Sequence, residues 1–319
     1  MTTIGVLSYN VRYANRGDHH DAWHDRRDAV ARLVRFHRPD IAAFQEPTRE
    51  QRRDLRERLP SYEFVGRGRN RGGDGEGCPI AVRSDRWHVV DDGTFWLSET
   101  PEEPSTDWNA AHPRIATWAR IQASPMSDET ETDGATSGGG VENAEPACLL
   151  VNTHFDHVSA QARRESARLI RDRATALAKG ASTATVSEEW RDAERDCEES
   201  DSMLPVVFLG DLNCTSGSDP HRILLGDDPE TESDDPETES DDPDGDDGIS
   251  FRDAAAVATL RHGPKTSLTD FARLIDGRRI DHTLVSPAFD VEAFATLTDR
   301  DDRGRYPSDH LPILSRLTL

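Results

Sequence analysis

The sequence of 319 residues predicts a layered α/β domain whose β-sheets are at least partly antiparallel. Two observations lead to this fold class. The apolar runs are short, scattered and rich in β-branched residues, which is typical of strands. Helical patterns lie between some of these runs, whereas other runs follow one another without a helix. Strands in series mixed with helices indicate layers of both element types.

Eight apolar runs are predicted to be strands. In chain order they are IGVLSYNV (4–11), IAAFQE (41–46), PIAVR (79–83), IATWARI (115–121), CLLVNTHF (148–155), VVFLGDLN (206–213), IDHTLVS (280–286) and ILSRLTL (313–319). Two segments have apolar residues at helical spacing. WHDRRDAVARLVRFHRPD (23–40) predicts a helix that stops before Pro39, and SAQARRESARLIRDRATALAKG (159–180) predicts one that ends at a glycine.

The charge is strongly acidic, with 61 Asp and Glu against 38 Lys and Arg and a net charge of -23. Lys179 and Lys265 are the two lysines; all other basic residues are arginines. An acidic surface that avoids lysine suits a protein kept soluble in molar salt, where the Debye length is about 3 Å. We therefore predict a halophilic source. The alternative is an ordinary acidic protein with one acidic insert.

Two segments are predicted to be disordered insertions. Residues 124–147 contain almost nothing to bury, and residues 227–247 repeat DDPETES twice before the variant DDPDGDD. The second segment has thirteen acids and no base, so it accounts for -13 of the net charge. Such a run cannot bury enough surface to offset the entropy of ordering. We expect a solvated loop there, with calcium binding as the alternative.

The cysteines and the N-terminus indicate the compartment. Cys78, Cys148, Cys197 and Cys214 lie far apart without a CxxC pair, so we expect reduced thiols rather than a disulfide framework. The start, MTTIGVLSYNVRY, lacks the features of a signal peptide. No run reaches the roughly 18 apolar residues needed to cross a membrane. The sequence predicts a soluble, cytoplasmic protein without a membrane anchor.

Polar side chains gather where the predicted strands end. Because side chains alternate along a strand, Asp211 and Asn213 of GDLN should share a face while Leu212 points into the core. The same alternation in NTHFDH should put three residues on one side: Asn152, His154 and Asp156. Other predicted strand ends and the SDH loop supply Asn10, Glu46, Asp281, Asp309 and His310.

Hard oxygen ligands with few thiolates suit Mg²⁺, Mn²⁺ or Ca²⁺. Imidazoles beside such an ion suit phosphoryl chemistry, in which charge builds on the transferred group. Each motif alone has a plainer interpretation, since Glu46 or Asn10 could cap a turn and Gly-Asp often marks one. A zinc hydrolase built on His154, His157 and Cys214 is a further alternative, but a strand would put the two histidines on opposite faces.

In this order, the motifs resemble the endonuclease/exonuclease/phosphatase superfamily, whose members resemble DNase I. They are YNVRY, FQE, NTHFDH, GDLN, RIDH and SDH, and the resemblance runs from LSYNVRY to YPSDHLPILSRL. Residues 93–121 look like a little-characterised branch of it. The resemblance implies a four-layer α/β sandwich, with two mixed β-sheets packed face to face and helices on the outer faces. The site would draw on the whole chain, so residues 1–319 would form a single domain.

The resemblance also implies a role for each motif residue. Glu46 would be the main ligand of Mg²⁺, for which Mn²⁺ could substitute, with Asn10 beside it and Asp309 completing the site. Five residues would be catalytic. Asp211 would take the proton of the attacking water, Asn213 would orient the nucleophile or the phosphate, and His154 would contact the phosphate. His310, held in its tautomer by Asp281, would also contact the phosphate. Both imidazoles would donate hydrogen bonds to the phosphate without a permanent charge.

Three further residues are candidates for substrate contact. Arg114 in HPRIATW could bind a phosphate, with a surface salt bridge as the alternative. Asp156 and His157 could contact the leaving group or a metal, with local hydrogen bonding to the next helix as the alternative.

The substrate is less defined by the sequence. An acidic protein in molar salt has little of the electrostatic attraction on which nucleic-acid binding depends, and VGRGRNRGGDGEG (65–77) is the basic exception. We therefore predict a Mg²⁺-dependent phosphoesterase, preferably a phosphodiesterase, acting on nucleic acid, a small phosphorylated metabolite or a lipid headgroup. A nuclease specific for DNA or RNA is one alternative. A catalytically silent binding module is another, although the complete motif set speaks against it.

Overall fold

The computed structural model describes residues 2–124, 148–180, 203–230, 248–275 and 277–319. The predicted insertion 124–147 lies outside these ranges except for Ser124. Of the predicted insertion 227–247, residues 231–247 also lie outside them. Residues 227–230 are described, and Asp228 accepts hydrogen bonds at 2.6 and 2.9 Å from Arg168.

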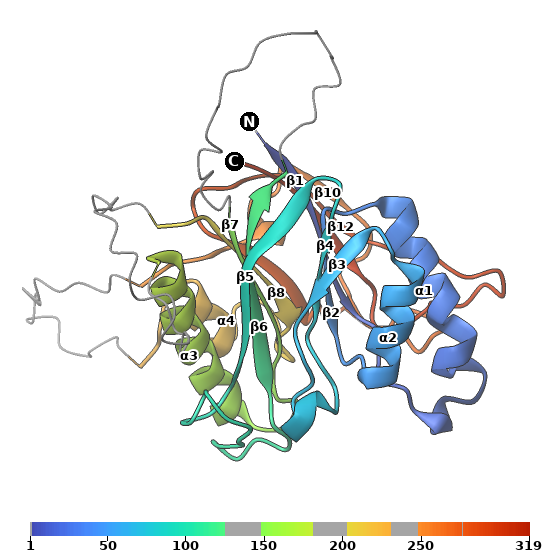
Figure 1. Ribbon diagram of the computed structural model, residues 1–319, viewed down its shortest axis with the longest axis horizontal. Helices are drawn as coiled ribbons and strands as arrows, with labels where there is room; N and C mark the ends of the chain where they lie inside the picture. Colours follow the sequence, from blue (N-terminus) through green and yellow to red (C-terminus); the bar gives the residue numbers. More distant parts are fainter. Residues whose placement is uncertain (1, 125–147, 181–202, 231–247, 276) are drawn as a thin grey trace, which may run out of the picture.

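The described chain forms two mixed β-sheets that pack face to face (Figure 1). From edge to edge, one sheet contains β10 (Leu260–His262), β12 (Asp290–Thr296), β13 (Ile313–Thr318), β1 (Thr3–Asn10), β2 (Ile41–Gln45), β4 (Ile80–Arg83) and β3 (Tyr62–Val65). The other contains β5 (Trp87–Trp96), β6 (Ile115–Ala123), β7 (Cys148–His154), β8 (Val206–Asp211), β11 (Asp281–Val285) and β9 (Arg252–Asp253).

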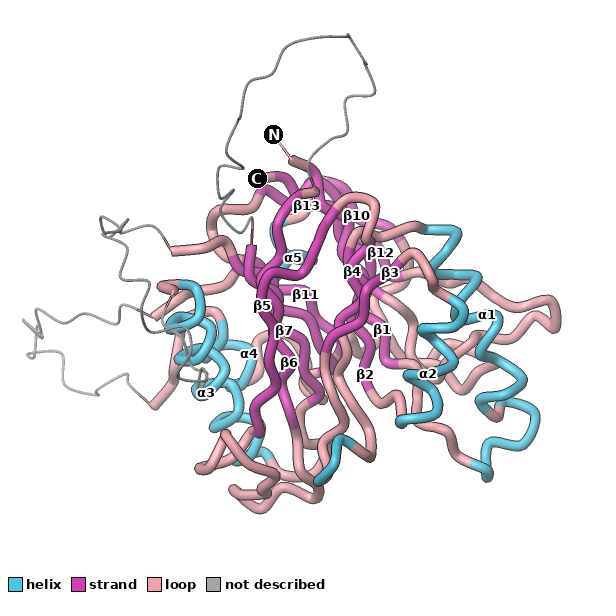
Figure 2. The backbone as a smooth tube through the Cα atoms, in the orientation of Figure 1, coloured by secondary structure: helices cyan, strands magenta, loops and turns pink. Residues whose placement is uncertain are grey.

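Helices cover the outer face of each sheet (Figure 2). The first sheet carries α1 (Trp23–His37) and α2 (Arg49–Arg58), and the second carries α3 (Ala160–Ala178) and α4 (Asp219–Leu224). A four-residue helix, α5 (Ala254–Val257), follows β9, and short 3-10 turns span Arg16–Asp21 and Arg71–Gly73. The four-layer sandwich implied by the resemblance is therefore confirmed.

The central strands are buried on both faces. In β1, Ile4 and Val6 belong to the apolar layer between the sheets, while Leu7 and Tyr9 pack in the layer under α1 and α2. In β7, Leu150 faces the inter-sheet layer and Val151 faces α3. Two-sided burial is why these strands appear in the sequence as continuous apolar runs instead of alternating patterns.

All eight predicted strands and both predicted helices are present, and their ends differ from the predicted ones by at most two residues. Five observed strands were not predicted from the sequence: β3, β5, β9, β10 and β12. In β5 the middle residues are exposed, so its sequence WHVVDDGTFW lacks an apolar run. The helix α2 was not predicted either, although Thr48 and Gln51 form a capping box, which is a sequence signal for the start of a helix.

None of the helices within the described ranges has the length and hydropathy needed to cross a bilayer. Cys78, Cys148 and Cys214 are free thiols, and Cys197 lies outside the described residues.

Candidate active site

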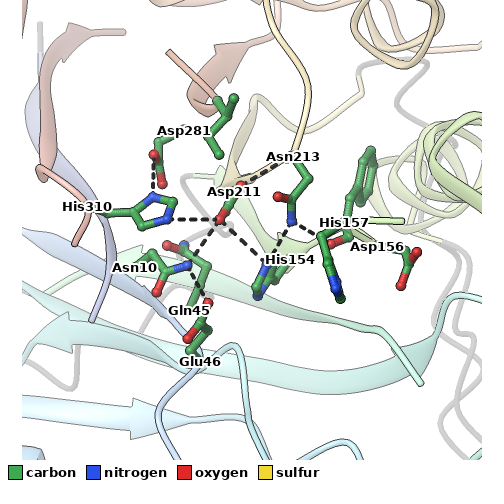
Figure 3. Close-up of polar contacts among 12 residues, drawn as sticks. Asn10, Gln45, Glu46, His154, Asp156, His157, Asp211, Asn213, Asp281 and His310 are labelled. Atoms are coloured by element: carbon green, nitrogen blue, oxygen red, sulfur yellow. Dashed lines mark hydrogen bonds and ion pairs between the residues drawn. The ribbon is translucent and has the colours of Figure 1, made fainter. Parts of the chain in front are cut away.

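Strands from both sheets deliver polar side chains to one edge of the sandwich. In the first sheet β1 and β2 are parallel, and Asn10 lies opposite Gln45, the residue before Glu46. In the second sheet β7 and β8 are parallel, and His154 lies opposite Asp211. Because parallel strands end at the same edge, these side chains meet there, as Figure 3 shows.

Asp211 lies at the centre of this group and is only 1% exposed (Figure 3). Its Oδ2 accepts a hydrogen bond at 3.0 Å from Asn10 Nδ2, and lies 3.5 Å from His154 Nε2 and 3.7 Å from His310 Nε2. Burial, reinforced by the Asp281 carboxylate, raises the pKa of Asp211 to about 7. The carboxylate is therefore balanced between its two protonation states near neutral pH.

His310 is held by Asp281, the first residue of β11, which lies opposite Asp211 in the sheet. Its Nδ1 is 2.8 Å from Asp281 Oδ2. Burial opposes a charge on the ring, but the carboxylates of Asp281 and Asp211 outweigh it and raise the pKa of His310 well above its usual value. The expectation of an uncharged donor is thus wrong for His310, because two buried carboxylates favour the imidazolium.

His154 has the opposite electrostatics. Burial, together with the positive charge of Arg114, lowers the pKa of His154 well below its usual value, so the ring is neutral. The Asn213 amide donates to His154 Nε2 at 2.9 Å, which leaves the ring proton on Nδ1. The same amide donates to the Phe155 carbonyl at 2.9 Å. Asn213 therefore fixes the orientation of the His154 ring.

The strands end earlier than the sequence predicted, which changes two expectations. β8 ends at Asp211, and Asn213 adopts a left-handed conformation (φ 47°) in which its N–H donates to Asp211 Oδ1 at 2.9 Å. Leu212 is fully buried, as predicted. β7 ends at His154, so Asp156 does not continue the face of the strand. Its Oδ1 instead accepts from the N–H groups of Val158 and Ser159 before α3.

Glu46 is held in a strained backbone conformation. Its φ of 71° is uncommon for a residue with a Cβ and persists where the surroundings impose it. Oε1 accepts from Asn10 Nδ2 at 2.9 Å, and Oε2 accepts from the Tyr13 N–H at 2.8 Å. One amide group of Asn10 thus joins the carboxylates of Glu46 and Asp211.

The residues around Glu46 fit a hard divalent cation. Carboxylate oxygens are ligands preferred by Mg²⁺ and Mn²⁺, and Glu46 and Asp211 supply them on either side of the Asn10 NH₂ group, whereas Asn10 Oδ1 accepts from the Arg12 N–H at 2.9 Å. Burial raises the pKa of the thiol of Cys214, the cysteine of the zinc alternative, and keeps it protonated. A protonated thiol is a poor zinc ligand, which weakens the zinc alternative.

Asp309 has a partner that the sequence did not reveal. Its Oδ2 is 2.5 Å from Arg12 Nη1, and Arg12 also donates to both carboxylate oxygens of Asp18 at 2.8 Å. Arg12 lies two residues after Asn10 and has a left-handed backbone conformation, with a φ of 54°. The arginine of YNVRY was the available signal, but nothing in its spacing indicated that it reaches residue 309.

Arg114 lies in the wall of the same pocket, with Glu46, Arg69 and His154. It is 6% exposed, so the alternative of a surface salt bridge is excluded. Its Nη2 is 3.1 Å from His157 Nδ1. Within the described chain its buried Nε has no hydrogen-bond partner, although the Asp156 carboxylate lies 3.8 Å away. A guanidinium with an unused donor at this place can receive an anion.

The arginine–glycine loop folds back on itself. Arg69 donates to both carboxylate oxygens of Glu76, at 2.8 and 2.9 Å, and Gly68 pairs with Gly77. Burial raises the pKa of Glu76 despite this pair. The charge of Arg69 is therefore largely satisfied within the loop.

Comparison with known proteins agrees with this geometry. The model of the Endonuclease/Exonuclease/phosphatase family matches residues 7–310. The chain belongs to this family. Its members are enzymes that hydrolyse phosphoester bonds and generally use divalent metal ions. No curated protein matches the chain.

Solved structures extend the similarity over nearly the full length. A family protein from Bacteroides thetaiotaomicron is 29% identical, with 99% of this chain and 97% of that chain covered and a TM-score of 0.75. The mannosyl-6-phosphatase Bt3783 of the same organism is 28% identical, with 99% and 100% covered and a TM-score of 0.75. A family protein from Bacteroides vulgatus is 29% identical, with full coverage of both chains and a TM-score of 0.75.

Proposed function

We propose that this protein is a Mg²⁺-dependent phosphoesterase in which Asp211 activates water for in-line attack on phosphorus. The observation that carries the proposal is the contact of one buried carboxylate with Asn10, His154 and His310 at the edge where both sheets end. A general base works best with a pKa near the working pH, and the pKa of Asp211 is raised to about 7.

Glu46, with Asn10 and Asp309, would hold the metal ion. When bound, Mg²⁺ or Mn²⁺ would neutralise charge that develops on the phosphate. The strained backbone of Glu46 and its link to the Asp211 carboxylate through the Asn10 amide support this assignment. Asp309 is the weakest of the three candidates, because Arg12 already pairs with its carboxylate.

His310 and His154 would act on the phosphate from two sides with different charge. The imidazolium of His310 donates through Nε2 to a non-bridging oxygen, while Asp281 holds its Nδ1–H. Neutral His154 contributes a second imidazole that Asn213 orients. Of the two imidazoles only His310 is charged, and its positive charge lies next to Asp211. This charge reduces the free energy needed to keep the Asp211 carboxylate ionised.

A phosphodiester was the preferred substrate from the sequence, but a phosphomonoester is a second candidate with its own support. Arg114 adds a buried cation with an unused donor beside Glu46 and His154, which suits the second negative charge of a monoester. One similar structure is named a mannosyl-6-phosphatase. A nuclease gains less support, because Arg69 of the arginine–glycine loop is paired with Glu76.

The test is hydrolysis of bis-p-nitrophenyl phosphate and p-nitrophenyl phosphate, each with MgCl₂, MnCl₂ or EDTA in molar KCl. We expect metal-dependent release of nitrophenolate by the wild type, and its loss in Asp211→Asn and His310→Ala. Asp85→Asn and His24→Ala, which change exposed side chains, are the matched controls. Full activity in EDTA or in Asp211→Asn would refute the mechanism, and no turnover of a broad phosphoester panel would favour the silent binding module.

The cytoplasmic location and the halophilic source remain predictions.

A further inference from the structure

A second cavity lies on the side of the sandwich where the edge strands β9 and β10 are found. Its volume is about 950 Å³, which is the size of a pocket for a small organic molecule. It is lined by residues of the loop after β8, of β9 and α5, of the segment 261–265 and of β12. The candidate catalytic and metal-binding residues do not line it, so it is distinct from the site around Asp211. We call it the β9–β12 cavity.

The β9–β12 cavity is positively charged in a strongly acidic protein. Four of its lining residues are Arg252, Arg261, Lys265 and Arg279, whereas its described lining includes one carboxylate, that of Asp253. Lys265 is one of two lysines in a chain of net charge -23. It is exposed, and it forms no hydrogen bond or ion pair with the described part of the chain. The excess of cations over carboxylates in this lining therefore indicates an anionic ligand.

The single carboxylate is already neutralised. Asp253 Oδ2 lies 2.5 Å from Arg279 Nη2, 3.1 Å from His221 Nε2 and 3.2 Å from Ser216 Oγ. Its Oδ1 accepts from the Ala255 N–H at 2.9 Å. Asp253 and Arg279 thus offset each other, and Arg252, Arg261 and Lys265 remain to attract an anion.

The same contacts exclude the simplest competing interpretation, a metal site made of His221, Asp253 and His282. His282 Nε2 lies 3.0 Å from the Cys214 carbonyl and donates to it, so Nδ1 holds the lone pair. That lone pair accepts from Arg279 Nη1 at 3.0 Å. The guanidinium of Arg279 therefore takes the place that a metal ion would need.

The cavity also has an apolar wall. Phe251, which precedes β9, and Phe294 of β12 line it. Val257 at the end of α5 also lines it, and 40% of its surface is exposed. Arg279 stacks over Phe294, with its guanidinium carbon 5.4 Å from the ring centroid. Phe251 and Phe294 are already buried, so Val257 is the part of this wall whose exposed hydrocarbon a bound apolar or aromatic group would remove from water.

We propose that the β9–β12 cavity binds an organic phosphate of nucleotide size. Its phosphate groups would contact Arg261 and Lys265, and its ring would lie against Val257, beside the Arg279 guanidinium that covers Phe294. Guanidinium and ammonium groups recognise phosphate, and the volume accommodates a ring system beside it. The proposal does not depend on the phosphoesterase function.

The test uses a fluorescent N-methylanthraniloyl derivative of ADP as the probe and fluorescence anisotropy as the measurement. The protein carries Asp211→Asn and the buffer contains EDTA, so that neither hydrolysis nor a metal in the catalytic site contributes. The buffer has the lowest KCl concentration at which circular dichroism shows a folded chain, because salt screens phosphate contacts. We expect saturable binding that unlabelled ADP reverses.

Two substitutions at the cavity, Lys265→Glu and Arg261→Glu, should each weaken binding by about tenfold or more. The control is Lys179→Glu, which changes the second lysine of the chain, directly after α3. It should leave binding unchanged. Val257→Ser should weaken binding as well, because it removes the apolar contact without adding a charge. Three results would overturn the proposal. They are an absence of saturable binding, an unchanged affinity for the probe in both Lys265→Glu and Arg261→Glu, and an affinity for inorganic phosphate alone that equals the affinity for ADP.

Discussion

Replacing Asp281 by asparagine tests the link between His310 and the proposed chemistry. Asp281 is fully buried, its Oδ2 lies 2.8 Å from His310 Nδ1, and it raises the pKa of His310. Asparagine keeps the size of the side chain but removes the charge. Its NH₂ group can also donate to Nδ1, which would keep that nitrogen unprotonated and hold the ring in its neutral form with the proton on Nε2.

The expected loss follows from the hydrogen bond. A hydrogen bond to a charged partner contributes about 1.5–3 kcal/mol, and each 1.4 kcal/mol is a factor of about ten in rate. We therefore expect kcat/KM of Asp281→Asn to fall about 10- to 150-fold.

The pH profile separates this account from simple misfolding. The carboxylate keeps His310 protonated, so its removal should let the ring lose its proton at lower pH. The basic limb of the kcat/KM profile should therefore move to lower pH in Asp281→Asn, measured with p-nitrophenyl phosphate and MgCl₂. An unchanged basic limb with reduced activity, in a variant that melts like the wild type, would refute the assigned role.

Three further predictions concern stability, substrate binding and the acidic segment. The folded-state pKa of Asp211 is about 7 against an ordinary 3.8, so in EDTA the wild type should lose up to about 4 kcal/mol between pH 4 and 8 through this group. Asp211→Asn should lack that loss in calorimetry, and parallel pH curves would contradict the raised pKa. Arg114→Gln should raise KM or lower kcat/KM for p-nitrophenyl phosphate about 10- to 150-fold, whereas kinetics like the wild type would remove Arg114 from the site. Replacing residues 231–247 by a Gly-Ser linker should change kcat less than twofold, since Arg168 already holds Asp228 and Glu230; a large loss would show a function for the segment.

The central strands and the motif residues at their ends could be predicted because both have local signals. A strand buried on two faces contains a continuous apolar run, and Asp211 and His154 are the last residues of two such strands. Edge strands such as β5 lack this signal, because their exposed middle residues resemble a loop.

The missing parts depend on contacts between distant residues. Arg12 reaches Asp309 across 297 positions, and only the folded chain brings them together. Asp156 was placed on a strand face because the end of β7 could not be located from alternation alone. The charge of His310 depends on two carboxylates from different strands, so its motif could not reveal it.

The most direct test of the central claim is the position of bond cleavage. Hydrolysis of the best substrate from the panel in ¹⁸O-labelled water, with MgCl₂, separates attack on phosphorus from attack on carbon. In-line attack by water that Asp211 activates predicts one ¹⁸O atom in the phosphate product, none in the alcohol, and no turnover by Asp211→Asn. Label in the alcohol, or labelled phosphate formed equally fast by Asp211→Asn, would contradict it.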